Sequence, residues 1–114
     1  MTPRHLSDRE RQMLDLVLSA DFDGVHELRE QARSAVVVGR CKCGCPSIAL
    51  EVSDDAPAAR LASRLVPSEG DILDEPRGQI ILFLDDGRLS YLEYVWFGDR
   101  PSEWPDPSRV RVVG

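Results

Sequence analysis

One stretch of this chain, residues 79–96 (QIILFLDDGRLSYLEYVW), restricts the possible fold more than any other. Two apolar runs flank the dipeptide Asp86-Gly87. This dipeptide favours the two-residue type I′ turn of a β-hairpin, in which both central residues need a positive φ. The sequence therefore predicts two paired antiparallel strands, over about residues 79–85 and 88–96.

The length of the hairpin loop decides which residues share a face of the sheet. A two-residue loop pairs Leu82 with Tyr91, whereas a three-residue loop pairs Ile81 with Tyr91. Both registers put apolar side chains on both faces of the hairpin. A strand with one solvent-exposed face would instead alternate between apolar and polar residues. We therefore expect cover on both faces, from the N-terminal helices on one and from the C-terminal tail or another protein on the other.

Two helices are predicted before the sheet, within about residues 7–33. Ser7 and Glu10 fit a capping box, in which each side chain accepts a hydrogen bond from the backbone N–H of the other residue. Apolar residues at helical spacing follow in both segments. The link between them, at about residues 19–24, is short and predicts an antiparallel helix pair.

Two further strands are predicted over about residues 35–41 and 47–52, because valines fill the first and apolar residues alternate with others in the second. The intervening bend, CKCGCP, would join them as a hairpin. Residues 53–78 have no clear pattern: Val66 or Ile72 could sit in a short edge strand, and one or two helical turns could form over residues 58–65.

After the central hairpin comes a proline-rich tail, in which Trp104 is expected to pack back on the domain. Valines near the C-terminus could add an edge strand. Together these features predict a single α+β domain over residues 1–114: two N-terminal antiparallel helices packed on a mainly antiparallel sheet of about four strands, followed by the proline-rich tail.

The charge of the chain excludes some classes of partner. Its formal net charge is −6, whereas binding to a nucleic-acid backbone needs clustered Lys and Arg. The N-terminal segment has no apolar core of a leader peptide, and no apolar run has the ~18 residues of a membrane span. We expect a cytoplasmic bacterial protein that binds neither nucleic acid nor membrane.

Cys41, Cys43 and Cys45 form the one cluster that suggests chemistry. Sulfurs bound to one zinc ion lie less than ~4 Å apart, whereas alternate residues of a strand are ~6.6–6.8 Å apart. A regular strand would therefore keep these sulfurs apart, although Gly44 and Pro46 could bend it enough. A zinc site would take its fourth ligand elsewhere, from His5, His26 or a carboxylate; the alternatives are redox chemistry and plain thiols in a tight turn.

No other motif indicates an active site or a cofactor. The chain has no phosphate-binding loop, no dinucleotide-binding glycine fingerprint and no nucleophile elbow, so we predict no catalytic residue. Aromatic side chains are favoured at protein interfaces, and four of them are candidate contacts: Tyr94, Trp96, Phe97 and Trp104.

Two segments, GRCKCGCPSIALEV and DDGRLSYLEYVWFGDRP, resemble a family of small uncharacterised bacterial proteins. That resemblance implies a helical start, a cysteine-rich turn entering a strand, a hairpin and a proline-bearing tail, and it implies no activity. The layout is also similar to that of proteins proposed as immunity proteins of bacterial toxin systems. The expected function is a non-enzymatic interaction module that binds a protein partner or itself; the alternative is a thiol- or zinc-dependent site at the three cysteines.

Overall fold

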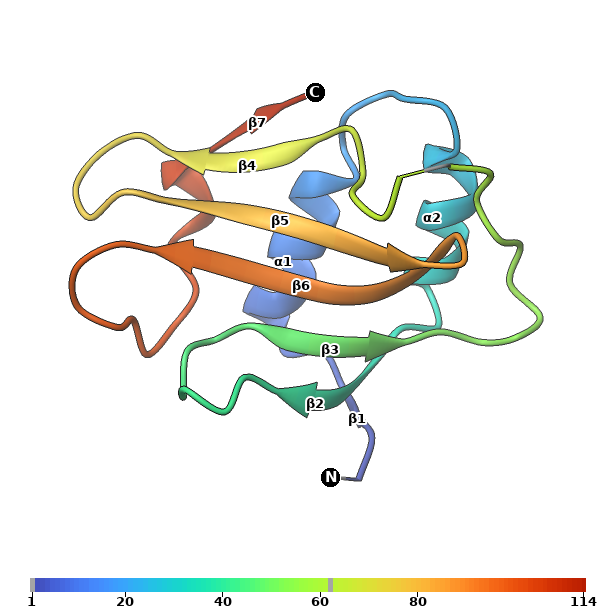
Figure 1. Ribbon diagram of the computed structural model, residues 1–114, viewed down its shortest axis with the longest axis horizontal. Helices are drawn as coiled ribbons and strands as arrows, with labels where there is room; N and C mark the ends of the chain where they lie inside the picture. The colour runs from blue at the N-terminus through green and yellow to red at the C-terminus, as the bar shows by residue number, and fades with distance from the viewer. Residues whose placement is uncertain (1, 62) are drawn as a thin grey trace.

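The strands of this protein form one antiparallel sheet, and both helices pack against the same face of it (Figure 1). The computed structural model describes residues 2–61 and 63–114. In chain order the elements are β1 (Arg4–His5), α1 (Asp8–Val17), α2 (Val25–Ala32), β2 (Val36–Arg40), β3 (Ile48–Glu51), β4 (Glu69–Ile72), β5 (Gly78–Asp85), β6 (Arg88–Trp96), the 3₁₀ turn η1 (Pro107–Arg109) and β7 (Val110–Val113).

The prediction of a sheet of about four strands is wrong, because the described residues form seven strands in the order β1-β2-β3-β6-β5-β4-β7. The four predicted strands are present as β2, β3, β5 and β6, and β2 pairs with β3 across the cysteine turn. The added strands lie outside these four: β1 forms one edge of the sheet, and β4 and then β7 extend it at the other. β1 has two residues, and β4 (Glu-Gly-Asp-Ile) has little intrinsic strand propensity, so both depend on their neighbours for pairing.

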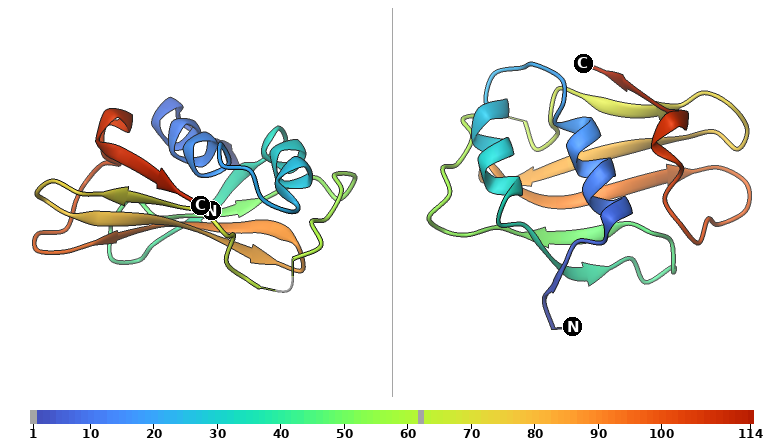
Figure 2. Two further views of the ribbon diagram at one scale, coloured as in Figure 1. Left: turned by 90° about the horizontal axis from the view of Figure 1, so that it is seen from above. Right: turned by 180° about the vertical axis from the view of Figure 1, so that it is seen from behind.

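Helix α1 begins as predicted, with both hydrogen bonds of the Ser7–Glu10 capping box in place. Its buried face and that of α2 meet the sheet behind β5 and β6. The two helices run side by side in opposite directions in both views of Figure 2, as the short link between them predicts. Neither helix in the described part of the chain has the length and apolar character that a bilayer crossing needs.

The central hairpin has the predicted turn. Neither of the two predicted registers, however, holds along its whole length. Asp86 and Gly87 have φ of 50° and 76°, and Leu84 pairs with Leu89, as a two-residue loop requires. The pairing then shifts, because Tyr91 and not Ser90 lies opposite Phe83. Ser90 is thus the extra residue of a β-bulge.

The bulge sorts the apolar residues of the hairpin between the two faces. Beyond it, Leu92 and Tyr94 face the helices and are buried together with Leu89, which an unbroken period of two could not achieve. Tyr91 and Glu93 turn to the opposite face and are only half-buried. The bulge therefore explains how Leu89, Leu92 and Tyr94 come to share the helix face, while apolar residues of both strands remain on the opposite face.

Within residues 2–61 and 63–114, the chain covers the helix side of the sheet and leaves the other face partly open. The tail returns over the helix side of the sheet, where η1 lies beside the helices (Figure 2), and Trp104 stacks on the buried Tyr94. On the open face, four apolar side chains of the hairpin are only half-buried: Ile81, Phe83, Tyr91 and Val95.

The segment between β3 and β4, for which the sequence shows no clear pattern, contains no helix within residues 53–61 and 63–68. Ala62, part of the candidate helical turns over residues 58–65, lies outside the described residues. Near its end this segment pairs with the edge of β5: Leu84 N–H donates to the Arg64 carbonyl at 2.6 Å, and Val66 N–H donates to the Leu82 carbonyl at 3.2 Å.

Candidate metal centre

The three cysteines lie in the turn between β2 and β3, and hydrogen bonds close this turn on itself. Cys41 N–H donates to the Ser47 carbonyl at 3.2 Å, and Gly44 N–H donates to the Cys41 carbonyl at 3.1 Å. Gly44 has a φ of +90°, a conformation that a side chain would strain. The glycine therefore permits the bend that an extended strand would lack.

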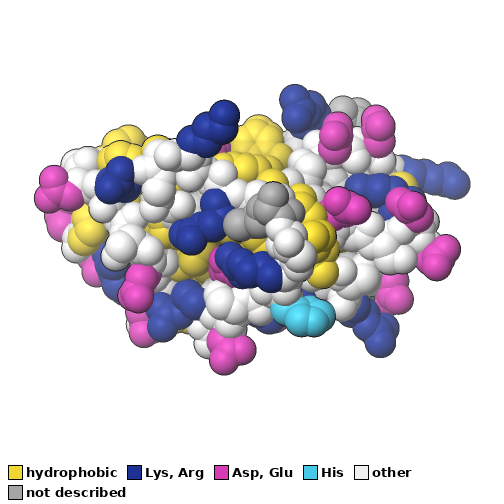
Figure 3. Space-filling model, turned by 90° about the horizontal axis from the view of Figure 1, so that it is seen from below, with side chains coloured by type: hydrophobic (Ala, Val, Ile, Leu, Met, Phe, Trp, Pro, Cys, Tyr) yellow, Lys and Arg dark blue, Asp and Glu magenta, His cyan; other side chains and the backbone are white. Residues whose placement is uncertain are grey.

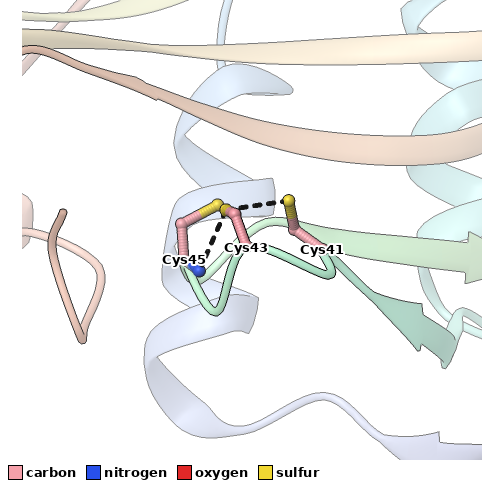
Figure 4. Close-up of side chains that lie close together, drawn as sticks. All are labelled: Cys41, Cys43 and Cys45. Carbon is pink, nitrogen blue, oxygen red and sulfur yellow. Dashed lines mark hydrogen bonds between the residues drawn. The ribbon is translucent and has the colours of Figure 1, made fainter.

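This bend brings the three sulfurs together. All three Sγ atoms lie within 4.8 Å of one another, and those of Cys41 and Cys43 are 3.0 Å apart. In Figure 4 the side chains leave the turn on the same side. Zinc bound tetrahedrally at ~2.3 Å would place its sulfurs about 3.8 Å apart, which lies between these two separations. The three thiols can thus reach one ion through small side-chain movements.

The surroundings of Cys45 favour its thiolate form. Burial raises the pKa of this thiol, but hydrogen bonds from Ser47 and the neighbouring cysteine thiols outweigh burial and bring the pKa to about 7. The Ser47 oxygen lies 3.4 Å from the sulfur and accepts a 2.9 Å hydrogen bond from Tyr94 N–H. Its own proton is therefore free to point at Cys45.

The other two thiols are more open to solvent: Cys43 is exposed and Cys41 is partly exposed. The Cys41 thiol beside it raises the pKa of Cys43, and the Cys45 N–H, 3.3 Å from the Cys43 sulfur, opposes that rise. Tyr91 lies close by: burial first, and then the charges of Cys41 and Cys45, raise the pKa of its phenol to about 12. The phenol is therefore neutral at physiological pH.

The fourth ligand considered from the sequence does not join the cluster. Among the described residues, the group of metal-binding side chains here consists of the three cysteines alone, without His5, His26 or a carboxylate. Three protein ligands around a zinc ion leave one coordination position for water or another molecule.

Two residues that the sequence analysis missed support the turn. Arg100, on the tail, donates a hydrogen bond from Nη1 to the Cys43 carbonyl, and Ser47, the residue before β3, faces Cys45. No spacing pattern links Arg100 to a turn so distant in sequence. Ser47 follows the cysteine run directly, and a hydroxyl beside thiols is the one signal that could have pointed to it.

The four aromatic residues predicted as interface contacts do not form one exposed surface. Tyr94 and Trp104 are buried and stack with ring centroids 5.5 Å apart. Trp96 is partly buried against the core, and Phe97 is 61% exposed. Of these four residues, Phe97 alone is open to a partner.

No protein-family model, curated protein or solved structure matches this chain. The resemblances described from the sequence therefore stay predictions, and an argument for function rests on the chain's own residues.

Proposed function

We propose that this protein binds one thiophilic metal ion, with zinc as the first candidate, through Cys41, Cys43 and Cys45. The observation that carries the proposal is the convergence of three sulfurs within 4.8 Å in a turn. Such close thiols are unfavourable as three separate anions but become favourable ligands once a cation neutralises them.

The donor set narrows the class of metal. Thiolates select soft or borderline ions such as Zn²⁺ and Cu(I), whereas Mg²⁺ and Ca²⁺ prefer oxygen ligands. Three thiolates also suit a site with one open position. Since Cys43 is exposed, a further ligand could reach the metal from solvent.

The experiment is metal analysis of protein purified without chelator, followed by cobalt substitution. We expect one zinc per chain and a near-ultraviolet sulfur-to-cobalt charge-transfer band. Replacing each cysteine by serine should weaken zinc binding at least about tenfold, since each removes a thiolate ligand. Lys42→Ala, in the same turn, keeps all three thiolates and should keep the metal. Protein that stays metal-free in zinc buffer, with three freely titrating thiols, would refute the proposal.

A second candidate function is protein association through the open face of the sheet. Phe83 and Tyr91 pack edge to face there, with ring centroids 6.4 Å apart, and both are only half-buried. Light scattering tests this candidate. A strict monomer at high concentration that binds no partner would count against it, whereas a dimer that Phe83→Ser weakens and Phe97→Ser does not would support it.

A further inference from the structure

A second candidate site lies beside the cysteine turn, next to the start of α1. A cavity of about 380 Å³ is bounded by β1, the start of α1, the end of β2 and the tail after β6. Pro46, which directly follows Cys45, forms part of its wall. The volume is at the small end of the ~300–1,000 Å³ range of ligand pockets. It suits a molecule the size of a small metabolite.

Three arginines line this cavity, and one of them is already paired. Arg4 forms two hydrogen bonds with the Glu10 carboxylate, of 2.8 and 3.0 Å. The side chains of Arg9 and Arg40 form no hydrogen bond or ion pair with other described residues. Since Glu103 is the one other acidic residue in the lining, the formal balance is one net positive charge.

The net positive charge of the cavity lining contrasts with the formal net charge of the whole chain, which is −6. In the edge view of Figure 3, several basic side chains lie near the middle, whereas basic and acidic side chains are mixed toward the ends. Hydrogen bonds from Ser108 are the main cause of the lowered pKa of Asp106, and the charge of Arg9 adds a smaller contribution. Asp106 does not line the cavity, so Arg9 remains available to a ligand there.

Trp104 gives the cavity an apolar wall with one polar atom that lacks a partner. The residue is 6% exposed and is held by its stacking on Tyr94. Its indole N–H is buried and makes no hydrogen bond to any described residue. A buried donor without an acceptor is costly and calls for an explanation. Since this nitrogen has less than 1 Å² of accessible surface, an acceptor would reach it only after the surrounding side chains move.

We propose that this cavity binds a small organic anion, with its carboxylate or phosphate between Arg9 and Arg40 and its apolar part against Trp104 and Pro46. Guanidinium groups match both anions through paired N–H donors. Proline and indole supply the apolar contact that inorganic ions would not use. The proposal is independent of metal binding, because neither guanidinium nor the indole belongs to the three-sulfur cluster.

The test is titration of the ¹⁵N-labelled protein with benzoate and with phenyl phosphate, followed by the indole N–H resonances. Trp96→Phe assigns the Trp104 resonance. We expect a saturable shift of the Trp104 signal with at least one of these anions, and a much weaker one with benzyl alcohol, which has the ring without the charge. Benzoate binding identifies a carboxylate site and phenyl phosphate binding a phosphate site. A Trp104 signal that neither anion moves would overturn the proposal.

Arginine variants separate the cavity from general surface charge. Arg9→Gln combined with Arg40→Gln should weaken binding of the anion at least about tenfold, because both charge-assisted contacts are lost. Arg60→Gln combined with Arg64→Gln removes the same two charges at exposed positions outside the cavity and should leave the affinity unchanged. Since Arg9 and Arg40 are exposed, the double variant should keep a dispersed amide spectrum. Equal affinity of this folded variant and the parent would also overturn the proposal.

Discussion

The side-chain oxygen of Gln31 accepts a hydrogen bond of 2.9 Å from the backbone N–H of Leu89, which fastens helix α2 to the start of β6. The amide nitrogen of the same side chain donates to the carbonyls of Pro57, at 2.7 Å, and Gly87, at 2.9 Å. Gln31 is fully buried. One polar side chain thus satisfies three backbone groups at the point where helix, loop and hairpin meet.

Replacing this side chain should cost much of the stability of the fold. Gln31→Leu keeps the apolar packing but leaves buried backbone groups without partners, so we expect a loss of about 3 kcal/mol in the free energy of unfolding. Chemical denaturation measures it. The exposed Gln12 of α1 is the matched control, and Gln12→Ala should change stability by less than about 0.5 kcal/mol. Equal losses in the two variants would contradict this account.

Alanine substitutions at Gly87 and Gly98 can distinguish the cost of backbone strain from the cost of a steric clash with neighbouring atoms. Both have a positive φ, of 76° and 79°, so alanine at either position should cost about 1 kcal/mol of strain. Only at Gly87 would a Cβ overlap the Ala59 carbonyl, whereas nothing lies within 4 Å at Gly98. Gly87→Ala should therefore be clearly more destabilising in denaturant titration. Equal midpoints would mean that the loop at Ala59 moves away freely.

The elements that the sequence predicts well are those with a strong local signal. The capping box at Ser7 and the turn at Asp86-Gly87 depend on residues close in sequence, and both are confirmed. Strand β4 carries no such signal, because Glu-Gly-Asp-Ile pairs only where β5 and β7 flank it. The predicted register of the central hairpin was wrong for a similar reason. The position of the bulge depends on which residues are buried on the helix side, and that burial depends on the whole fold.

The candidate site was predictable in composition but not in geometry. The sequence identifies Cys41, Cys43 and Cys45, while strand spacing argues against their convergence. The left-handed conformation of Gly44 and the closing hydrogen bond from Cys41 to Ser47 bring the sulfurs together. Neither can be derived from the spacing of the cysteines alone.

The Arg4–Glu10 pair should make stability depend on pH in the acid range. Burial raises the pKa of Glu10, but hydrogen bonds from Arg4 and Ser7 outweigh it and hold the pKa below its usual value. A carboxyl whose pKa is lower in the folded state stabilises the fold above its unfolded pKa, near 4.5. This contribution is lost as the pH falls through the folded pKa.

The comparison with Glu10→Gln isolates this contribution, because glutamine can keep the capping-box hydrogen bond but not the charge. We expect the parent to be more stable than the variant at about pH 7, and the difference to shrink by about pH 3.5. Denaturant titrations at both pH values measure it. A difference that stays constant with pH would show that the ionised carboxylate contributes nothing.

Zinc affinity should fall as the pH is lowered, because the ligands must lose protons before they bind. With its pKa brought to about 7, Cys45 should be partly ionised at neutral pH, whereas Cys43, with a raised pKa, should lose its proton to the solvent only when the metal binds. Competition with a chromophoric chelator at about pH 6 and about pH 8 measures the effect. Ser47→Ala should steepen this pH dependence and Ser90→Ala should not. An affinity that is constant over this range would exclude thiolate ligands.

Cys41 and Cys43 should form a disulfide when the metal-free protein meets a small-molecule disulfide. One thiolate attacks the reagent and releases a small thiolate, and the second cysteine then displaces the other half. The protein loses two hydrogen atoms, and the reagent becomes two thiols. The contact of 3.0 Å between the two sulfurs favours this pair over either pair with the buried Cys45.

Intact mass and thiol counting measure this oxidation. We expect a fall of about 2 Da and one remaining thiol in the metal-free protein, and protection of all three thiols when zinc is bound, since a coordinated thiolate is a poorer nucleophile. Cys45→Ser should still form the disulfide, whereas Cys43→Ser should stop at a mixed disulfide. Because oxidation removes two of the three ligands, zinc added afterwards should bind at least about a hundredfold more weakly. Oxidation at the same rate with and without zinc would show that these sulfurs do not hold the metal.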